Sequence, residues 1–192
     1  MIVIFIGPPG SGKSTQAKNV AKKIKVPFIS MGQVLRDANK TGTLLGKKAS
    51  KYIERGKLIP TKLIRTFIKF RLEEEDCKNG FILDGSPRRV EEAVLLDDYF
   101  EQKGWKLERI ILIEISGEES LKRLLKRSRL PDDQGGGRND DEIKDIKLRL
   151  KEYRDNIDII KSYYRKQDKL CILNGEGTIE EVTKRVFSIM QL

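Results

Sequence analysis

A strand-loop-helix pattern at the start of the chain sets the strongest limit on its fold. The apolar residues 1–6 lead directly into 7–15, which read Gly-Pro-Pro-Gly-Ser-Gly-Lys-Ser-Thr, and residues 16–24 have the pattern of a helix. The spacing is that of loops whose backbone N–H groups cradle nucleotide phosphates. Glycines let these groups turn inward, and the following helix adds partial positive charge at its N-terminus. The segment predicts a phosphate-binding loop; a glycine-rich turn without a ligand is the alternative.

The composition indicates one globular domain with a heavily solvated surface. The chain has 192 residues, of which 38% are hydrophobic and 35% are charged. No apolar run approaches the length of a membrane span, and residues 1–6 lack the basic flank and cleavage site of a signal peptide. We therefore expect a cytoplasmic protein that makes no membrane contact.

Residue usage also excludes several kinds of site. The sequence has no histidine, and its two cysteines, Cys77 and Cys171, are isolated, so neither a zinc site nor a disulfide framework is expected. The net charge of +10 suits nucleic acid, an acidic surface or small polyphosphates. Because aromatic and basic residues are not interleaved, nucleic acid binding is not expected as the main function.

Five short apolar segments alternate with helical patterns. The segments are residues 2–6, 27–30, 81–84, 109–115 and 169–173. Mostly apolar strands separated by helices favour a parallel sheet that is covered by helices on both faces. The sequence therefore predicts a single α/β domain.

Two stretches interrupt this alternation. About fifty residues separate the second and third segments, which is more than one crossover needs. They contain short helical patterns around 32–38, 46–54 and 61–74 and predict a small helical insertion. Residues 128–137 contain a proline and three consecutive glycines, which forbid regular structure. Between two helical patterns they predict a mobile flap, with a plain loop as the alternative.

A long helix is expected over residues 140–165. Its apolar residues recur at alternating steps of three and four, as in a heptad seam, at Ile143, Ile146, Leu150, Tyr153, Ile157, Ile160 and Tyr164. The seam allows a coiled-coil dimer or packing on the chain's own sheet. We favour the second because the α/β core needs a cover, and we expect a monomer.

A carboxylate stands at the end of the third apolar segment. Asp84 is followed by Gly85, Ser86, Pro87 and Arg88. The carboxyl ends of strands in open α/β sheets face the ligand, and a carboxylate there can hold Mg²⁺ through water. The glycine and proline would turn the chain and point Arg88 back over the sheet edge. The alternative is a simple Asp-Gly turn.

Together these features resemble the adenylate kinase family, within the nucleoside monophosphate (NMP) kinases. The resemblance covers essentially the whole chain and keeps the order and spacing of the motifs at 7–17, 30–36, 56–60, 84–88, 138–141 with Arg149, and 174–177. It implies a P-loop NTPase-type fold with a five-stranded parallel sheet flanked by helices. It also implies a core of 1–29, 60–127 and 138–192, a helical NMP-binding insertion at 30–59 and a short lid at 128–137.

The resemblance implies reversible phosphate transfer from ATP to an NMP, with small nucleotides as partners. Mg²⁺ would be held largely through water by Ser14 and Asp84. Arg123 would lie by the ATP base and Arg127 on its phosphates; being four residues apart, both can lie on one helix face. The implied ATP-binding residues are Gly10, Ser11, Gly12, Lys13, Ser14, Thr15, Arg123, Arg127 and Gly177.

On the acceptor side, the resemblance places Arg36 and Arg88 on the NMP α-phosphate, while Arg138 and Arg149 clamp the transferring group. The implied NMP-binding residues are Met31, Arg36, Leu58, Ile59, Gly85, Arg88, Glu92, Arg138 and Arg149. The implied catalytic residues are Lys13, Arg88, Arg127, Arg138 and Arg149. Asp140 and Asp141 read as helix-start residues. The lid has no cysteines, so it resembles the short-lid forms and no zinc is expected.

The chain departs from the family pattern at several site positions. Five positions differ from the family residue: Ser14 replaces Gly, Met31 replaces Thr, Gln33 replaces Asp, Ser86 replaces Phe and Arg89 replaces Thr. Ser14 restores the general phosphate-loop pattern. Ser86 removes an aromatic side chain, and Arg89 adds a cation beside the expected NMP phosphate site.

Glu92 is the departure that bears on the substrate. The family has Gln at this position, where it reads adenine. An ionised carboxylate only accepts hydrogen bonds, so it suits the ring N–H and amino group of guanine, or the amino group of cytosine, better than the unprotonated ring nitrogen of adenine. We expect AMP as the acceptor, with GMP or UMP/CMP as the alternative. Two alternatives remain open: Glu91 and Glu92 both face solvent, or a backbone group reads the base.

Two other functions remain open at this level. A related P-loop kinase acting on another small molecule would lack the pair Arg36 and Arg88, which this chain has. A nucleotide-gated RNA-binding protein would use the basic charge, and would show slow, RNA-stimulated NTP hydrolysis without dependence on an NMP.

Overall fold

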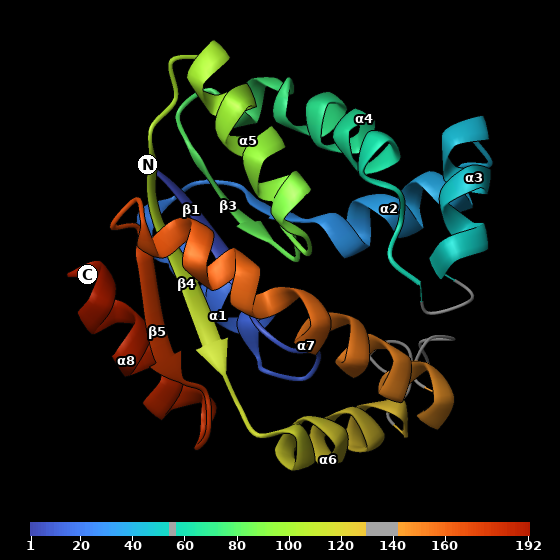
Figure 1. Cartoon of the computed structure of the whole chain (residues 1–192). Helices are drawn as coiled ribbons and strands as arrows, with labels where there is room; N and C mark the ends of the chain where they lie inside the picture. Colours follow the sequence, from blue (N-terminus) through green and yellow to red (C-terminus); the bar gives the residue numbers. More distant parts are fainter. Residues whose placement is uncertain (54–56, 130–141) are drawn as a thin grey trace.

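A five-stranded parallel sheet forms the centre of the molecule (Figure 1). The computed structural model describes residues 1–53, 57–129 and 142–192. The strands are β1 (Ile2–Ile6), β2 (Phe28–Ser30), β3 (Phe81–Asp84), β4 (Leu107–Glu114) and β5 (Leu170–Asn174). They lie in the order β2-β3-β1-β4-β5, and every neighbouring pair is parallel. The predicted α/β fold with five parallel strands is confirmed.

The helices fill the connections between the strands. They are α1 (Lys13–Ile24), α2 (Met31–Lys40), α3 (Leu44–Ile53), α4 (Thr61–Leu72), the short 3₁₀ helix η1 (Glu75–Cys77), α5 (Val90–Gln102), α6 (Gly117–Ser128), α7 (Ile143–Arg165) and α8 (Ile179–Met190). Side-chain caps mark two of these starts: Ser116 accepts from Glu119 N at α6, and Thr178 forms a capping box with Glu181 at α8. Such caps satisfy N–H groups that have no partner within the helix.

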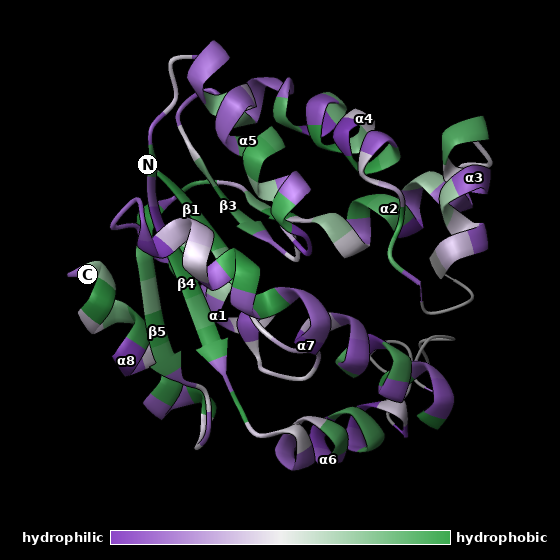
Figure 2. Cartoon of the chain, viewed as in Figure 1, coloured by the Kyte–Doolittle hydropathy of each residue, from purple (hydrophilic) through white to green (hydrophobic). Residues whose placement is uncertain are grey.

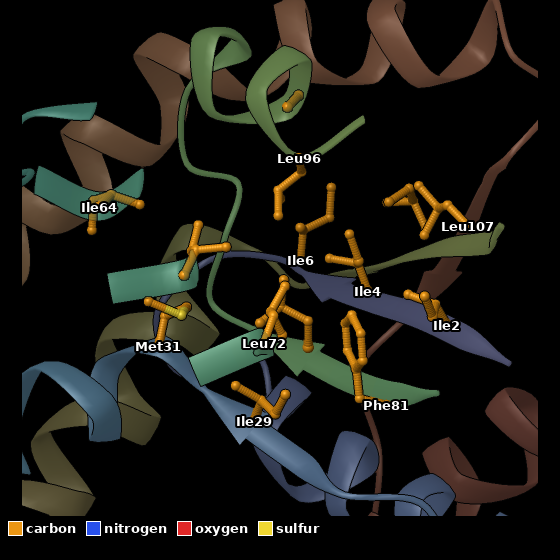
Figure 3. Packing of buried hydrophobic residues seen from close by; sticks show 14 of the residues in the cluster. Ile2, Ile4, Ile6, Ile29, Met31, Ile64, Leu72, Phe81, Leu96 and Leu107 are labelled. Atoms are coloured by element: carbon orange, nitrogen blue, oxygen red, sulfur yellow. The ribbon is translucent and has the colours of Figure 1, made fainter. Parts of the chain in front are cut away.

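Alternation along β1 divides the core into two layers. Ile2, Ile4 and Ile6 face one cluster of buried side chains, whereas Val3 and Phe5 face the other. Successive side chains of a strand point to opposite faces, so a strand that is apolar throughout needs cover on both sides. Helices α4, α5 and α7 supply the first cover, and α1 and α8 supply the second. Figure 3 shows the first cluster, and in Figure 2 the strands are the greenest part of the chain.

The element ends differ from the sequence predictions by a few residues. β4 begins at Leu107, before the predicted start at 109, because it pairs with β1 from that residue onward. The helical pattern predicted over 61–74 ends at Leu72, and the chain then forms η1. Helix α7 begins at Ile143; the predicted start at 140 lies outside the described residues.

The seam of α7 packs on the chain's own core. Ile146, Ile157, Ile160 and Tyr164 are buried, and the last three join the first core cluster. This confirms the packing on the sheet that the sequence analysis favoured over a coiled-coil dimer. The expected monomeric state stays a prediction.

No described helix combines the length and apolar character needed to cross a membrane.

Candidate active site

The loop between β1 and α1 has the backbone shape of a phosphate-binding loop. Gly10 and Gly12 both have φ of +83°, a left-handed conformation that favours glycine. A Cβ on Gly10 would lie 3.0 Å from the Ser120 carbonyl oxygen of α6. The Ser120 hydroxyl in turn donates to the Pro9 carbonyl. Helix α6 therefore supports the loop from behind, and the glycine permits this close approach.

Lys13 is the centre of positive charge in the loop. Its Nζ donates to the Pro8 carbonyl at 3.2 Å. Burial lowers the pKa of Lys13 to about 8; Asp84 opposes this shift, and Arg88, Arg149 and Arg127 add to it. Like charges lower the pKa of an ammonium only when they stand close to it. Three arginines that are distant in sequence therefore converge on the loop lysine, as anion binding requires.

Ser14 and Asp84 form a polar pair beside the loop. The Ser14 hydroxyl donates to Asp84 Oδ2 at 2.5 Å, and Asp84 is only 3% exposed. Parallel pairing places Asp84 opposite Phe5, so β3 ends next to the start of the loop. Asp84 Oδ1 is buried and has no hydrogen-bond partner among the described residues. A buried carboxylate oxygen without a partner is an available hard ligand.

These two oxygen donors fit Mg²⁺ that keeps most of its water. Within the described segments, no group of three or more His, Cys, Asp or Glu side chains could hold a metal ion. Mg²⁺ does not need such a cage, because it is commonly bound by one or two protein ligands together with waters and substrate phosphates. The donor set therefore suits a cation that arrives with a nucleotide.

One cavity of about 510 Å³ joins the parts of the site. Its size is in the usual range for small-molecule sites. Of the residues predicted from the sequence, the cavity is lined by Gly10, Gly12, Lys13, Ser14, Thr15, Met31, Arg36, Leu58, Ile59, Asp84, Gly85, Arg88, Glu92, Arg123, Arg127 and Arg149. Residues from five separate motifs thus line one space.

Three predicted residues have other placements. Ser11 is buried and does not line this cavity. Gly177 lies in the loop between β5 and α8 and does not line it either. Arg138 lies outside the described residues, as do Asp140 and Asp141.

The wall formed by α6 is tied to the loop between β5 and α8. Arg123 donates from Nε to Glu119 at 2.6 Å and from its terminal nitrogen to the Gly175 carbonyl at 3.2 Å. On the other side of this loop, Arg185 donates to the carbonyls of Asn174 and Glu176. Arg123 is thus fixed between α6 and the segment that contains Gly177, and Arg127 follows it by one turn.

The opposite wall holds two arginines in defined positions. On α2, Arg36 donates to Gln33 at 2.8 Å, and Gln33 donates to Asp37 at 2.7 Å. In the loop after β3, Arg88 donates from Nε to the Gly85 carbonyl at 2.9 Å. Gln33 thus orients Arg36. This contact was not predicted from the sequence, where Gln33 counted only as a departure from the family pattern; the spacing of three residues between Gln33 and Arg36 was the available signal.

Glu92 is buried, with 2% of its surface exposed, whereas its neighbour Glu91 is exposed. Its Oε2 accepts from the Ser86 hydroxyl at 3.0 Å and from the Arg88 backbone N–H at 2.9 Å. Burial raises the pKa of Glu92, and these hydrogen bonds and the nearby Arg88 charge oppose the shift. The solvent-facing alternative for Glu92 is therefore wrong. The pairing of Ser86 with Glu92 escaped the sequence analysis, which treated the two positions separately.

The arrangement suits transfer between two phosphate groups. The cavity is lined by five cationic side chains, Lys13, Arg36, Arg88, Arg127 and Arg149. The chain has no histidine that could serve as a base. Phosphoryl transfer asks chiefly for positioning and charge neutralisation, which cationic side chains provide. Arginine can also hold phosphate oxygens through two parallel hydrogen bonds.

Comparison with known proteins shows the family of the chain. Residues 5–169 match the model of the family described as adenylate kinase. The chain is 37% identical over 191 residues to the adenylate kinase of Thermobifida fusca, covering 100% of this chain and 98% of that protein. It is 39% identical over 181 residues to adenylate kinase 1 of a Nostoc species, covering 94% of each, and 40% identical over 184 residues to the adenylate kinase of Leptospira biflexa, covering 96% of each. The chain belongs to the adenylate kinase family.

Proposed function

We propose that this protein transfers the γ-phosphoryl group of ATP reversibly to AMP, giving two ADP. The observation that carries the proposal is that residues of the phosphate loop line one cavity together with Arg36 and Arg88. Two anionic substrates can meet there only if their charges are neutralised, and the surrounding cations supply this. The membership of the adenylate kinase family supports the same reaction.

The resemblance to the family assigns a role to each of these side chains. The loop N–H groups and Lys13 hold the β- and γ-phosphates of ATP, with Arg123 by its base and Arg127 on its phosphates. Arg36 and Arg88 hold the α-phosphate of AMP, and Arg149 neutralises the group in transfer together with Arg138. Ser14 and Asp84 would hold Mg²⁺ through its waters, and the ion would offset phosphate charge.

We further infer that residues 30–59 form the NMP-binding insertion and 128–137 the lid of one domain. Helices α2 and α3 project to one side of the sheet (Figure 1), and Arg36, Leu58 and Ile59 line the cavity from that side. The lid assignment rests on the sequence, since most of it lies outside the described residues. We propose a cytoplasmic monomer without zinc, in keeping with the free thiols of Cys77 and Cys171.

The direct test is phosphate transfer from Mg-ATP to AMP, GMP, CMP, UMP and dAMP at matched concentrations. We expect AMP to be phosphorylated well above the others. Preference for GMP or a pyrimidine nucleotide would keep the reaction and overturn the acceptor. No transfer to any monophosphate would overturn the proposed function, and RNA-stimulated ATP hydrolysis would then be measured.

A matched pair of variants tests whether Arg88 belongs to the proposed site. Arg88→Lys keeps the charge but loses the planar fork that holds two phosphate oxygens. Loss of one such contact should lower kcat by about a hundredfold. Arg65→Lys makes the same exchange on the exposed face of α4 and should leave the rate unchanged. Equal effects of the two exchanges would remove Arg88 from the proposed site.

A further inference from the structure

Two departures from the family pattern meet in one buried contact. Ser86 and Glu92 are 1% and 2% exposed, and their side chains hydrogen-bond at 3.0 Å. The same carboxylate oxygen accepts from the Arg88 backbone at 2.9 Å. Glu92 is the third residue of α5, so one side chain on the first helical turn holds two positions of the preceding loop.

Ordinary helix capping does not account for this contact. A Glu at the third helical position usually reaches back to the N–H group of the N-cap residue, which in α5 is Arg89. Glu92 instead bonds the residue before the cap, and also a hydroxyl two residues further back. Burial of a carboxylate is unfavourable, and hydrogen bonds offset only part of the cost. The contact therefore stabilises the loop before α5 more than it caps the N-terminus of α5.

The segment held in this way carries Arg88. Its backbone is fixed by Glu92, and its Nε donates to the Gly85 carbonyl at 2.9 Å. These contacts restrain the backbone and the Nε group of an exposed side chain that lines the cavity and lowers the pKa of Lys13 through its charge. A small displacement of Arg88 would change the position of its guanidinium relative to the phosphates, and rates are sensitive to such displacements.

We infer that Ser86 and Glu92 act as a pair that positions Arg88 for phosphoryl transfer, and this inference rests on the proposed function. Glu92 is then a positioning residue that acts through Arg88. The rival role is recognition of the acceptor base. Both observed hydrogen bonds end on Oε2, so Oε1 is the oxygen that a base amino group in the cavity would meet.

The two roles predict different kinetics for Glu92→Ala. Loss of positioning should lower kcat at saturating AMP by about ten- to a hundredfold, with a smaller change in KM. Loss of base recognition should raise KM for AMP and leave kcat almost unchanged. Glu92→Gln should recover most of kcat, because its amide oxygen can still accept from Ser86 and Arg88.

A change of substrate separates the roles a second time. Purine ribonucleoside 5′-monophosphate carries hydrogen in place of the 6-amino group of AMP. Under the positioning role, Glu92→Ala reduces transfer to both nucleotides by the same factor. A loss confined to AMP would overturn the inference in favour of base recognition.

Ser86→Ala keeps the inference testable even if Glu92→Ala fails to fold. This variant removes one hydroxyl and should lower kcat by about two- to fivefold, since Arg88 keeps its backbone bond to Glu92. In a Glu92→Ala background that folds, where the Ser86 hydroxyl has lost its acceptor, the same change should have a smaller effect, because the two side chains act together. Fully independent effects, or no effect of Ser86→Ala, would overturn the inference. A wild-type protein without NMP kinase activity would instead overturn the proposed function.

Discussion

Lys13 illustrates how the fold prepares a side chain for an anion. The Lys13 side chain is half-buried, its ammonium donates to the neutral Pro8 carbonyl, and arginines lie near it, so its pKa falls to about 8. Asp84 supplies the opposing charge. The free protein therefore holds an ammonium that lacks full compensation, and a bound phosphate would provide what is missing.

This leads to a prediction for the dependence of activity on pH. A lysine is charged below its pKa, so kcat/KM for ATP should be constant below about pH 8 and fall above it, since this parameter reports the free enzyme. kcat at saturating substrates should hold to higher pH, because bound phosphates raise the pKa of Lys13. Initial rates measured across this range provide the test. Lys13→Arg should lower activity but abolish the fall near pH 8; an unchanged fall would assign it to another group.

The buried Glu92 gives a second prediction, for stability. Burial holds its pKa above the ordinary value in the folded protein, while the Arg88 N–H and the Arg88 and Arg89 charges limit the shift. The folded state thus binds the proton more tightly than the unfolded state does. The resulting stability is present below the ordinary pKa and is lost as the pH rises through the folded pKa.

Glu92→Gln removes this proton linkage. The difference in Tm between the variant and the wild type should become more favourable to the variant as the pH rises through that window. Thermal melts at a series of pH values measure it. Glu91→Gln changes the exposed neighbour and should give a difference that varies little with pH. If the difference in Tm from the wild type varied with pH equally for both variants, the pKa of Glu92 would be the same in the folded and the unfolded chain.

At the scale of elements, the sequence predicted what depends on local pattern. The apolar runs located every strand, because a parallel sheet covered on both faces needs side chains that are apolar throughout. Their ends were less certain: β4 gains its first residues from pairing with β1, a partner about one hundred residues away. The choice between a coiled coil and core packing for α7 likewise depended on tertiary contacts, which the heptad pattern alone does not contain.

The same distinction between local sequence pattern and tertiary contacts applies to the site. Contiguous loop residues such as Lys13 and Ser14 could be predicted because their roles are fixed by spacing. The bond from Ser86 to Glu92 could not, because it depends on how the first turn of α5 meets the preceding loop. Arg123 was placed by its pattern, but its contact with the Gly175 carbonyl joins segments fifty-two residues apart.

The interface between α5 and α7 gives a prediction at this scale. Tyr163 donates to Asp97 of α5 at 2.8 Å. The hydroxyl of its neighbour Tyr164 is fully buried and has no hydrogen-bond partner among the described residues. A satisfied hydroxyl contributes about 1 kcal/mol, whereas a buried hydroxyl without a partner carries a cost of about 1–3 kcal/mol.

Tyr163→Phe should therefore destabilise the protein by about 1 kcal/mol. Tyr164→Phe should leave the stability equal or higher, although both variants remove the same atom from adjacent residues of one helix. Urea unfolding curves fitted with one m-value compare the free energies of unfolding of the two variants. A loss of stability in Tyr164→Phe would show that a bound water or another group satisfies its hydroxyl.

At the scale of the whole molecule, charge is distributed very unevenly. Residues 31–72 contain eleven Lys and Arg but two Asp and Glu, so they carry +9 of the net charge of +10. The segment includes α2, α3 and α4, which lie together at one side of the molecule (Figure 1). Lys47, Lys48 and Lys51 of α3 are exposed and form no ion pair within the described residues, and Arg36 and Lys57 line the cavity.

A basic field beside the acceptor site should attract anionic nucleotides from a distance. The effect should weaken as salt rises from about 0.01 M to about 1 M, because the Debye length falls from about 30 Å to about 3 Å. We therefore expect kcat/KM for AMP to decrease with ionic strength more steeply than kcat/KM for ATP, while kcat changes little. Steady-state rates with each substrate limiting in turn provide the measurement.

Two triple variants of equal charge change locate the source of this field. Replacement of Lys47, Lys48 and Lys51 by Gln should lower kcat/KM for AMP at low salt and flatten its salt dependence, with kcat unaffected. Replacement of Lys22, Lys23 and Lys184, which are exposed on α1 and α8, removes the same charge from elements covering the other face of the sheet and should have a smaller effect. Local charge acts more strongly than remote charge because salt screens the distant lysines first. Equal effects of the two triples would assign the attraction to net charge and not to the placement of lysines on α3.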